Sequence, residues 1–306
     1  MIQGFGDSNV AGYGVSAGQS FMGLFIPVNS GVSGAQAAEV SSLVQQATPT
    51  MFALYPLHVG LNDVSKYLGD AAKKEYYRRC LRAGIAWLAL FDKKTSRGAQ
   101  AGITFTGAWS DIASPNPCGK YTTQSGATAL ATVSGDTIYI GVTEGDNSSN
   151  GENISVKVDG VEKGSFSTKV SGITTWLGQS WGRTCWRIDG LSSGSHDVLI
   201  TNNSPSGKSF SLDWIAGSNQ IAASRLRVMN IAKCSAAWYS AAGVTEAMIQ
   251  GYNDIIASVA AEFYQYGVRL VDVFAYFDAA TCLQADGAHW NALGHYIVHQ
   301  VCSGAA

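Results

Sequence analysis

The sequence predicts an α/β protein, a parallel sheet covered by helices, interrupted by a long all-β segment. Up to about residue 98, and again after about residue 221, short apolar runs alternate with segments of helical periodicity, which is typical of βαβ units. Between about residues 102 and 218 the helical periodicity disappears, and short β-rich runs lie between turn signals. The composition agrees, since 46% of the residues are apolar, only 14% are charged and 35 are glycine.

The elements of the first α/β part follow in order. Residues 23–29 read as a short buried strand, and residues 35–47 as a helix that Pro49 ends. Residues 51–59 form the next apolar run and are predicted to be a strand. Residues 64–92 carry apolar side chains at helical spacing, which predicts one long amphipathic helix.

The β-rich segment is predicted to be an antiparallel sandwich. Its β-rich runs are residues 103–109, 129–142, 154–158, 186–188, 198–201 and 210–215, with turns expected at 134–136, 158–160 and 190–194. The α/β pattern then resumes with a strand at 225–231, a helix at 245–266, a strand at 268–273 and a helix from Trp290. We therefore expect a discontinuous α/β domain made of residues 1–98 and 221–306, with residues 99–220 inserted into it.

The charge pattern excludes several classes of partner. The net charge is −2 without a basic run, so no nucleic acid and no anionic membrane surface is expected. No apolar stretch reaches the ~18 residues that a membrane span needs. The chain has no signal peptide before its first motif, which favours a shortened chain or one domain of a larger polypeptide. An extracellular, cell-surface or phage-virion location is preferred over the cytoplasm.

The six cysteines are widely spaced and contain no C-x-x-C pattern, which argues against a zinc or dithiol site. Buried thiols and disulfides both stay open, and the pairs Cys118–Cys185 and Cys282–Cys302 are the ones to check. No metal and no cofactor is expected.

Three separate motifs supply the groups of an acyl-transfer site. Ser8 lies in Gly-Asp-Ser, Asn62 in Gly-Leu-Asn-Asp, and Asp286 and His289 in Asp-Gly-Ala-His. Such a site needs a nucleophile, a base, a carboxylate that orients the base and donors for the oxyanion. Ser8, His289 and Asp286 fit the first three roles, and Asn62 fits the fourth. The alternative for Ser8 is a helix N-cap. The alternative for Asn62 is a turn residue that caps the helix at Val64, and this is the role expected of Asp63.

With these motifs placed, the first and last thirds of the chain resemble the SGNH (GDSL-type) hydrolase family. Residues 6–8, 29–34, 60–63 and 286–289 match its motifs in order. The resemblance implies a three-layer α/β/α fold around a five-stranded parallel sheet. It also implies an oxyanion hole formed by the backbone N–H groups of Ser8 and Gly34 and the side chain of Asn62. Asn9 departs from the aliphatic residue that many members have there.

The β insertion resembles carbohydrate-binding sandwich modules only in its pattern of short β-rich runs and turns. It is also rich in aromatic residues. These are Trp109, Tyr121, Tyr139, Trp176, Trp181, Trp186 and Trp214. Trp176 and Trp181, in a loop-like stretch, are expected to contact substrate, together with Asn9 and His58 beside the motifs. The alternatives are that the rings fill the sandwich core, above all Trp214, or that the insertion is a lid or an oligomer contact.

Together these features predict a serine esterase that removes O-acetyl groups from a carbohydrate, with an acylated carbohydrate or another small ester as substrate. A lipase or thioesterase is the alternative among enzymes. A glycan-binding receptor module of a phage tail or cell surface, with incidental esterase activity, is the alternative from another class. The sequence does not indicate the oligomeric state.

Overall fold

A parallel sheet of five strands forms the centre of the α/β part, in the order β15-β14-β3-β1-β2. The computed structural model describes residues 2–25, 28–50, 53–91, 99–112, 119–219 and 225–304. The strands are β1 (Gln3–Gly6), β2 (Val28–Gly31), β3 (Leu54–His58), β14 (Arg225–Met229) and β15 (Arg269–Val271). The predicted parallel sheet is confirmed, and residues from both α/β parts of the sequence contribute to it.

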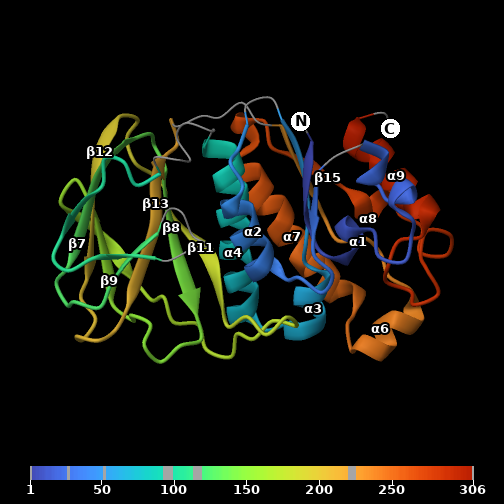
Figure 1. Cartoon of the computed structure of the whole chain (residues 1–306), viewed down its shortest axis with the longest axis horizontal. Coiled ribbons are helices and arrows are strands. Elements are labelled where there is room, and N and C mark those ends of the chain that lie inside the picture. The colour runs from blue at the N-terminus through green and yellow to red at the C-terminus, as the bar shows by residue number, and fades with distance from the viewer. Residues whose placement is uncertain are drawn as a thin grey trace.

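Helices cover both faces of this sheet (Figure 1). On one side lie α2 (Ala37–Gln46), α4 (Ala71–Leu90) and α7 (Glu246–Glu262), and on the other α1 (Ser8–Ala11), α8 (Val273–Tyr276) and α9 (Ala292–Ser303). Each side has its own apolar core. Two further helices, α3 (Leu61–Tyr67) and α6 (Ala236–Ala242), lie near the carboxyl ends of the parallel strands, where α/β proteins usually place their sites.

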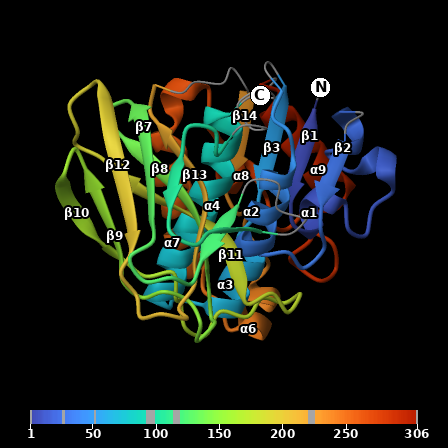
Figure 2. The same cartoon turned by 60° about the vertical axis from the view of Figure 1, so that its left-hand side comes forward.

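Two antiparallel five-stranded sheets are formed by the chain between α4 and β14, as predicted. One has the order β10-β9-β12-β7-β4 and the other β11-β8-β13-β6-β5. Their bounds are β4 (Thr104–Thr106), β5 (Ser110–Asp111), β6 (Lys120–Thr122), β7 (Thr128–Ser134), β8 (Ile138–Gly145), β9 (Ile154–Val158), β10 (Val161–Phe166), β11 (Trp181–Ile188), β12 (Ser195–Asn202) and β13 (Phe210–Gly217). Side chains such as Val142 from one sheet and Val156 from the other share one apolar core, and Figure 2 shows the two sheets at the side of the α/β part.

The second of these sheets packs directly against the helices. The Trp214 side chain is fully buried, and its ring lies 5.4 Å from that of Phe91 and 6.5 Å from that of Trp87. Its indole Nε1 donates to Gln45 of α2 at 3.2 Å. The ring of Tyr139 lies 4.9 Å from that of Phe263. Trp214 is therefore a core residue, but it lies in the seam between the β segment and the helix layer and not in the sandwich core where it was expected.

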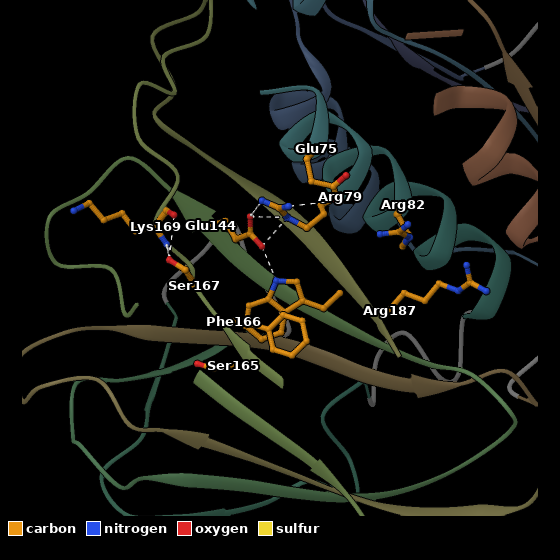
Figure 3. A pocket seen from close by; sticks show the side chains of 10 residues that line it. Glu75, Arg79, Arg82, Glu144, Ser165, Phe166, Ser167, Lys169 and Arg187 are labelled. Carbon is orange, nitrogen blue, oxygen red and sulfur yellow. Dashed lines mark hydrogen bonds and ion pairs between the residues drawn. The ribbon is translucent and has the colours of Figure 1, made fainter. Parts of the chain in front are cut away.

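Polar groups line a cavity of about 400 Å³ along the same seam (Figure 3). Arg79 of α4 donates to the buried carboxylate of Glu144, which also accepts the indole N–H of Trp186 at 2.6 Å. Arg82 forms a two-bond ion pair with Glu262 at 2.8 Å. Arg79 and Arg82 are thus each paired with a carboxylate, so neither offers an unpaired positive charge to a ligand in this cavity.

Two predictions on the elements were wrong. The buried strand expected at 23–29 does not occur in the described part of that range, because Gly23–Phe25 is a 3₁₀ turn and β2 is an exposed edge strand, while residues 26 and 27 lie outside the described residues. The long helix expected at 64–92 is two helices, since Leu68 has a φ of +52° and Asp70 starts α4 by accepting the N–H of Lys73. The 3₁₀ turns η1 (Ala17–Gln19) and η3 (Tyr264–Tyr266) complete the elements of the described chain.

The described cysteines are buried free thiols, namely Cys80, Cys185, Cys234, Cys282 and Cys302. The considered pair Cys282–Cys302 is therefore not a disulfide, and Cys118 lies outside the described residues. Among the helices of the described ranges, none combines the length and the apolar character of a membrane span.

Candidate active site

Ser8 lies where β1 turns sharply into α1. Gly6 has a φ of +157°, and a Cβ there would lie 2.1 Å from the backbone oxygen of His58, so this position requires glycine. Asp7 is 1% exposed and starts α1 by accepting the N–H of Asn9 at 3.0 Å. Together these neighbours place Ser8 at the first position of α1, with its hydroxyl at the edge of a cleft. Because α1 has only one turn, its dipole adds little to the site.

His289 connects Ser8 to Asp286. Its Nε2 lies 2.9 Å from the Oγ of Ser8, and its Nδ1 lies 2.6 Å from the Oδ2 of Asp286. When Nδ1 carries the proton and donates it to the carboxylate, Nε2 is left as the acceptor for the hydroxyl of Ser8. The three groups thus form one continuous hydrogen-bond chain in the orientation that proton transfer from a serine needs.

Asp286 is held as a carboxylate by its own turn. Its Oδ1 accepts the backbone N–H groups of Ala288 and His289, each at 3.0 Å. Partial burial alone would raise the pKa of Asp286, but these two N–H groups and the imidazole of His289 together lower it below its ordinary value. The turn needs Gly287, whose φ is +75° and whose Cβ would lie 1.9 Å from the Oγ of Ser235.

Three N–H donors of the predicted oxyanion hole belong to separate segments. Within the described residues, neither the backbone N–H of Ser8 nor that of Gly34 donates a hydrogen bond. Gly34 has a φ of +80° in the loop between β2 and α2. The Nδ2 of Asn62 donates to the backbone oxygen of Ala35 at 2.9 Å. An amide carries two N–H groups, so this bond leaves one of them for a ligand.

The cleft beside Ser8 has a volume of about 450 Å³. It is lined by Ser8, Leu61, Asn62, Ser65, Trp176, Trp238, Ala241, Ala242, Ala288 and His289. Trp176 comes from the loop between β10 and β11, whereas Trp238 comes from α6, a helix that the sequence analysis missed. The signals for α6 are Ser235, whose side chain accepts the N–H of Trp238, and Gly243 at its end.

The four expected substrate contacts have different positions. Trp176 is 53% exposed and lines the cleft, but Trp181 does not line it. Asn9 is buried and accepts the backbone N–H of Trp290 at 3.1 Å. His58 is 1% exposed, with its Nδ1 3.2 Å from the Oδ1 of Asp7. The predictions for Asn9 and His58 are corrected, because their side chains support the turn at Ser8 and have no surface to offer a substrate.

A residue that was not expected borders the catalytic histidine candidate. The ring of Tyr13 is half exposed and lies 4.3 Å from that of His289.

Asp63 caps a helix, as expected, but the helix is a different one from that expected. Its carboxylate accepts the N–H of Ala37 at the start of α2 at 3.0 Å, and burial raises its pKa well above the ordinary value.

Metal binding finds no support in the described part of the chain, where no group of three His, Cys, Asp or Glu side chains could hold an ion. His295 is buried and accepts the backbone N–H of Phe21, so it is a core histidine.

Comparison with known proteins gives remote likenesses. No protein-family model matches the sequence, and no curated protein matches it. A lipolytic G-D-S-L family protein from Veillonella parvula is 9% identical with a TM-score of 0.46, covering 99% of this chain and 96% of that one.

Two partial likenesses concern carbohydrate-active proteins. A family two carbohydrate esterase from Clostridium thermocellum, in complex with cellohexaose, covers 37% of this chain and 30% of its own at 17% identity and a TM-score of 0.29. The CBM36-1 domain of a xylanase from the hindgut metagenome of Trinervitermes trinervoides covers 38% and 90%, at 17% identity and a TM-score of 0.29. Likenesses this remote carry no functional argument, so the chemistry of the cleft rests on its own geometry.

Proposed function

We propose that this protein is a serine esterase with Ser8 as nucleophile, His289 as general base and acid, and Asp286 as the carboxylate that orients His289. The observation that carries this proposal is the hydrogen-bond chain Ser8–His289–Asp286, with distances of 2.9 Å and 2.6 Å. The alternative of a helix N-cap does not hold for Ser8, because Asp7 is the residue that caps α1 and Ser8 follows it. A cap would also not explain a histidine and a carboxylate aligned with the hydroxyl of Ser8.

The reaction follows from these contacts. The Oγ of Ser8 bonds to the ester carbonyl carbon while its proton passes to the Nε2 of His289. The oxyanion accepts the N–H groups of Ser8 and Gly34 and the second amide hydrogen of Asn62. The intermediate breaks its bond to the alcohol, which leaves with the proton from His289. A water molecule then gives a proton to His289 and attacks the acyl-enzyme. The acid is released as the bond to the Oγ of Ser8 breaks, and His289 returns the proton to that oxygen.

An O-acetylated carbohydrate is the proposed substrate. Trp176 and Trp238 line the cleft, and the ring of Tyr13 lies beside His289. Broad aromatic faces next to the nucleophile suit stacking on a sugar ring, and a volume of about 450 Å³ is within the range of small-molecule sites. In this proposal, residues 1–98 and 221–306 form the hydrolase, and the inserted residues 99–220 contribute Trp176 to its cleft.

Acetate release tests the proposal. The full chain, Ser8→Ala and Ser65→Ala are compared on p-nitrophenyl acetate and on an acetylated polysaccharide. Ser65 is a matched control, because it lines the same cleft but bonds to the backbone oxygen of Leu61 at 2.6 Å. We expect activity on both substrates for the native chain and Ser65→Ala and none for Ser8→Ala. Activity of Ser8→Ala equal to that of the native chain would refute the nucleophile.

The two alternatives have their own outcomes in the same assay. Hydrolysis of long-chain acyl esters without release of acetate from the polysaccharide would favour a lipase or thioesterase. Binding of the polysaccharide without any ester hydrolysis would favour a glycan-binding module.

A further inference from the structure

We infer that the loop 173–179 of the β insertion belongs to the catalytic machinery, because through Trp176 it holds both segments that carry the proposed oxyanion donors Gly34 and Asn62. This inference rests on the proposed esterase function and deepens it. Trp176 is then a positioning residue for the oxyanion hole, in addition to being a wall of the cleft.

Both N–H groups of Trp176 bind the α/β part. Its backbone N–H donates to the Oε1 of Gln36 at 2.8 Å, and its indole Nε1 donates to the backbone oxygen of Asn62 at 3.2 Å. Gln36 is fully buried and lies two residues after Gly34. The ammonium group of Lys66, on the same helix as Asn62, lies 4.3 Å from the centre of the Trp176 ring. Trp176 is therefore fixed to the Gly34 loop and to α3 at once.

A third contact closes these bonds into a ring. The side chain of Asn62 donates to the backbone oxygen of Ala35, which precedes Gln36 in the chain. The ring thus consists of three hydrogen bonds and one peptide link, and it runs from Ala35 to Gln36, Trp176, Asn62 and back to Ala35. Because Asn62 contributes both its backbone oxygen and its side chain to the ring, a displacement of Trp176 disturbs the direction of its remaining amide hydrogen.

The loop itself is well anchored, as a positioning element must be. Ile173 is fully buried in the core of the α/β part, and Thr175 is 3% exposed. Within the loop, the N–H of Thr175 donates to the oxygen of Gln179, and the N–H of Gln179 donates to the hydroxyl of Thr175, each at 2.9 Å. These contacts place Trp176 on a short loop that is closed by its own hydrogen bonds and packed into the core of the α/β part.

Positioning and sugar stacking can be separated, because they use different parts of Trp176. Stacking uses the exposed face of the ring and affects the KM for a glycan substrate. Positioning uses the indole N–H and affects kcat, even for a small ester without a sugar.

The test removes the indole N–H group and leaves a smaller aromatic ring in its place. Trp176→Phe in the full chain keeps an aromatic ring but removes the donor, and Trp181→Phe is the matched control, a tryptophan of the same insertion outside the cleft. The readouts are kcat and KM on p-nitrophenyl acetate and the rate at which a small fluorophosphonate modifies Ser8, measured by intact mass. We expect Trp176→Phe to lower kcat and the modification rate about tenfold with an unchanged KM. This loss is smaller than the ~100-fold or more expected for the direct donor in Asn62→Ala. Trp181→Phe should behave as the native chain.

Each other outcome is decisive. Trp176→Phe could instead keep the native kcat and the native modification rate and raise only the KM for acetylated polysaccharide. That result would show that Trp176 only stacks on the sugar. It would overturn the inference and leave the esterase proposal intact. If the native chain is folded but neither hydrolyses the ester nor is modified at Ser8, the proposed function fails and the inference with it. Should Trp176→Phe fail to fold, 3-benzothienylalanine at position 176 removes the N–H without changing the size of the ring, and the same two readouts decide.

Discussion

The Nε2 of His289 lies 2.9 Å from the Oγ of Ser8, although the two residues are 281 positions apart in the sequence. The parallel sheet brings them together, because Ser8 follows the end of β1 and His289 precedes α9 on the same side of the sheet. The carboxylate of Asp286 completes the hydrogen-bond chain, and it belongs to the same turn as His289.

Asp286→Asn tests the orienting carboxylate. An asparagine can still accept the backbone N–H groups, but it can also donate to Nδ1 and stabilise the wrong tautomer of His289. We expect kcat on p-nitrophenyl acetate to fall at least about a hundredfold. Asp278→Asn is the control, since Asp278 is an exposed carboxylate with similar local bonds to Ala280 and Thr281. Equal activity of the two variants would show that Asp286 does not orient His289.

On the acid side of the pH profile, kcat/KM should depend on the binding of a single proton. Partial burial alone would raise the pKa of Asp286, but its hydrogen bonds outweigh this effect and lower the pKa, so its carboxylate stays charged over the acid side of the profile. Because only neutral His289 can accept the proton of Ser8, log(kcat/KM) should fall with a slope of one as the pH decreases. A flat profile from about pH 5 to 8, or a slope of two, contradicts this assignment.

His295 should make the fold sensitive to acid. Burial, and then the positive charges that His289 and His58 can carry, lower the pKa of His295 from 6.5 to about 4. Between these two pH values the unfolded chain binds a proton that the folded chain does not, so the free energy of unfolding decreases as the pH falls. The loss can reach ~3 kcal/mol. Urea unfolding at a series of pH values should show a smaller loss in His295→Asn, and an equal loss would contradict the assignment.

Trp214→Ala tests whether the β segment and the helix layer form one cooperative unit. Trp214 is fully buried between β13 and the helices α2 and α4, with Gln45 as its hydrogen-bond partner. Its removal should lower the free energy of unfolding by ~3–5 kcal/mol in a single transition. Trp181→Ala, which removes a partly exposed ring of β11 in the same sheet, should cost much less. Two separate transitions, or equal effects of the two variants, would show that the seam does not couple the parts.

The elements with clear periodicity could be predicted from the sequence. The strands β3 and β14 and the helix α2 fall within the expected ranges, because a largely buried parallel strand and a helix with apolar residues at helical spacing have distinct patterns. The edge strand β2 could not be placed, since an edge strand buries little and the nearby apolar residues Phe21 and Met22 belong to the core beneath α9 instead.

The candidate site was predictable only where a motif carries its own chemistry. Ser8, Asp286 and His289 were named from residue type and order, and the structure places them within hydrogen-bond distance. Composition alone could not distinguish Trp176 from Trp181, because their difference lies in the path of a loop relative to α3. The buried environment of His58 likewise depends on Trp290, which is far away in the sequence.

The most direct test of the central claim is the site of covalent modification by a fluorophosphonate, mapped by peptide mass spectrometry in the native chain, Ser8→Ala and His289→Ala. We predict a single adduct on Ser8 in the native chain, no adduct in Ser8→Ala, and a modification rate reduced by at least about a hundredfold in His289→Ala. An adduct at another residue, or an undiminished rate in His289→Ala, would show that Ser8 and His289 do not act together as nucleophile and base.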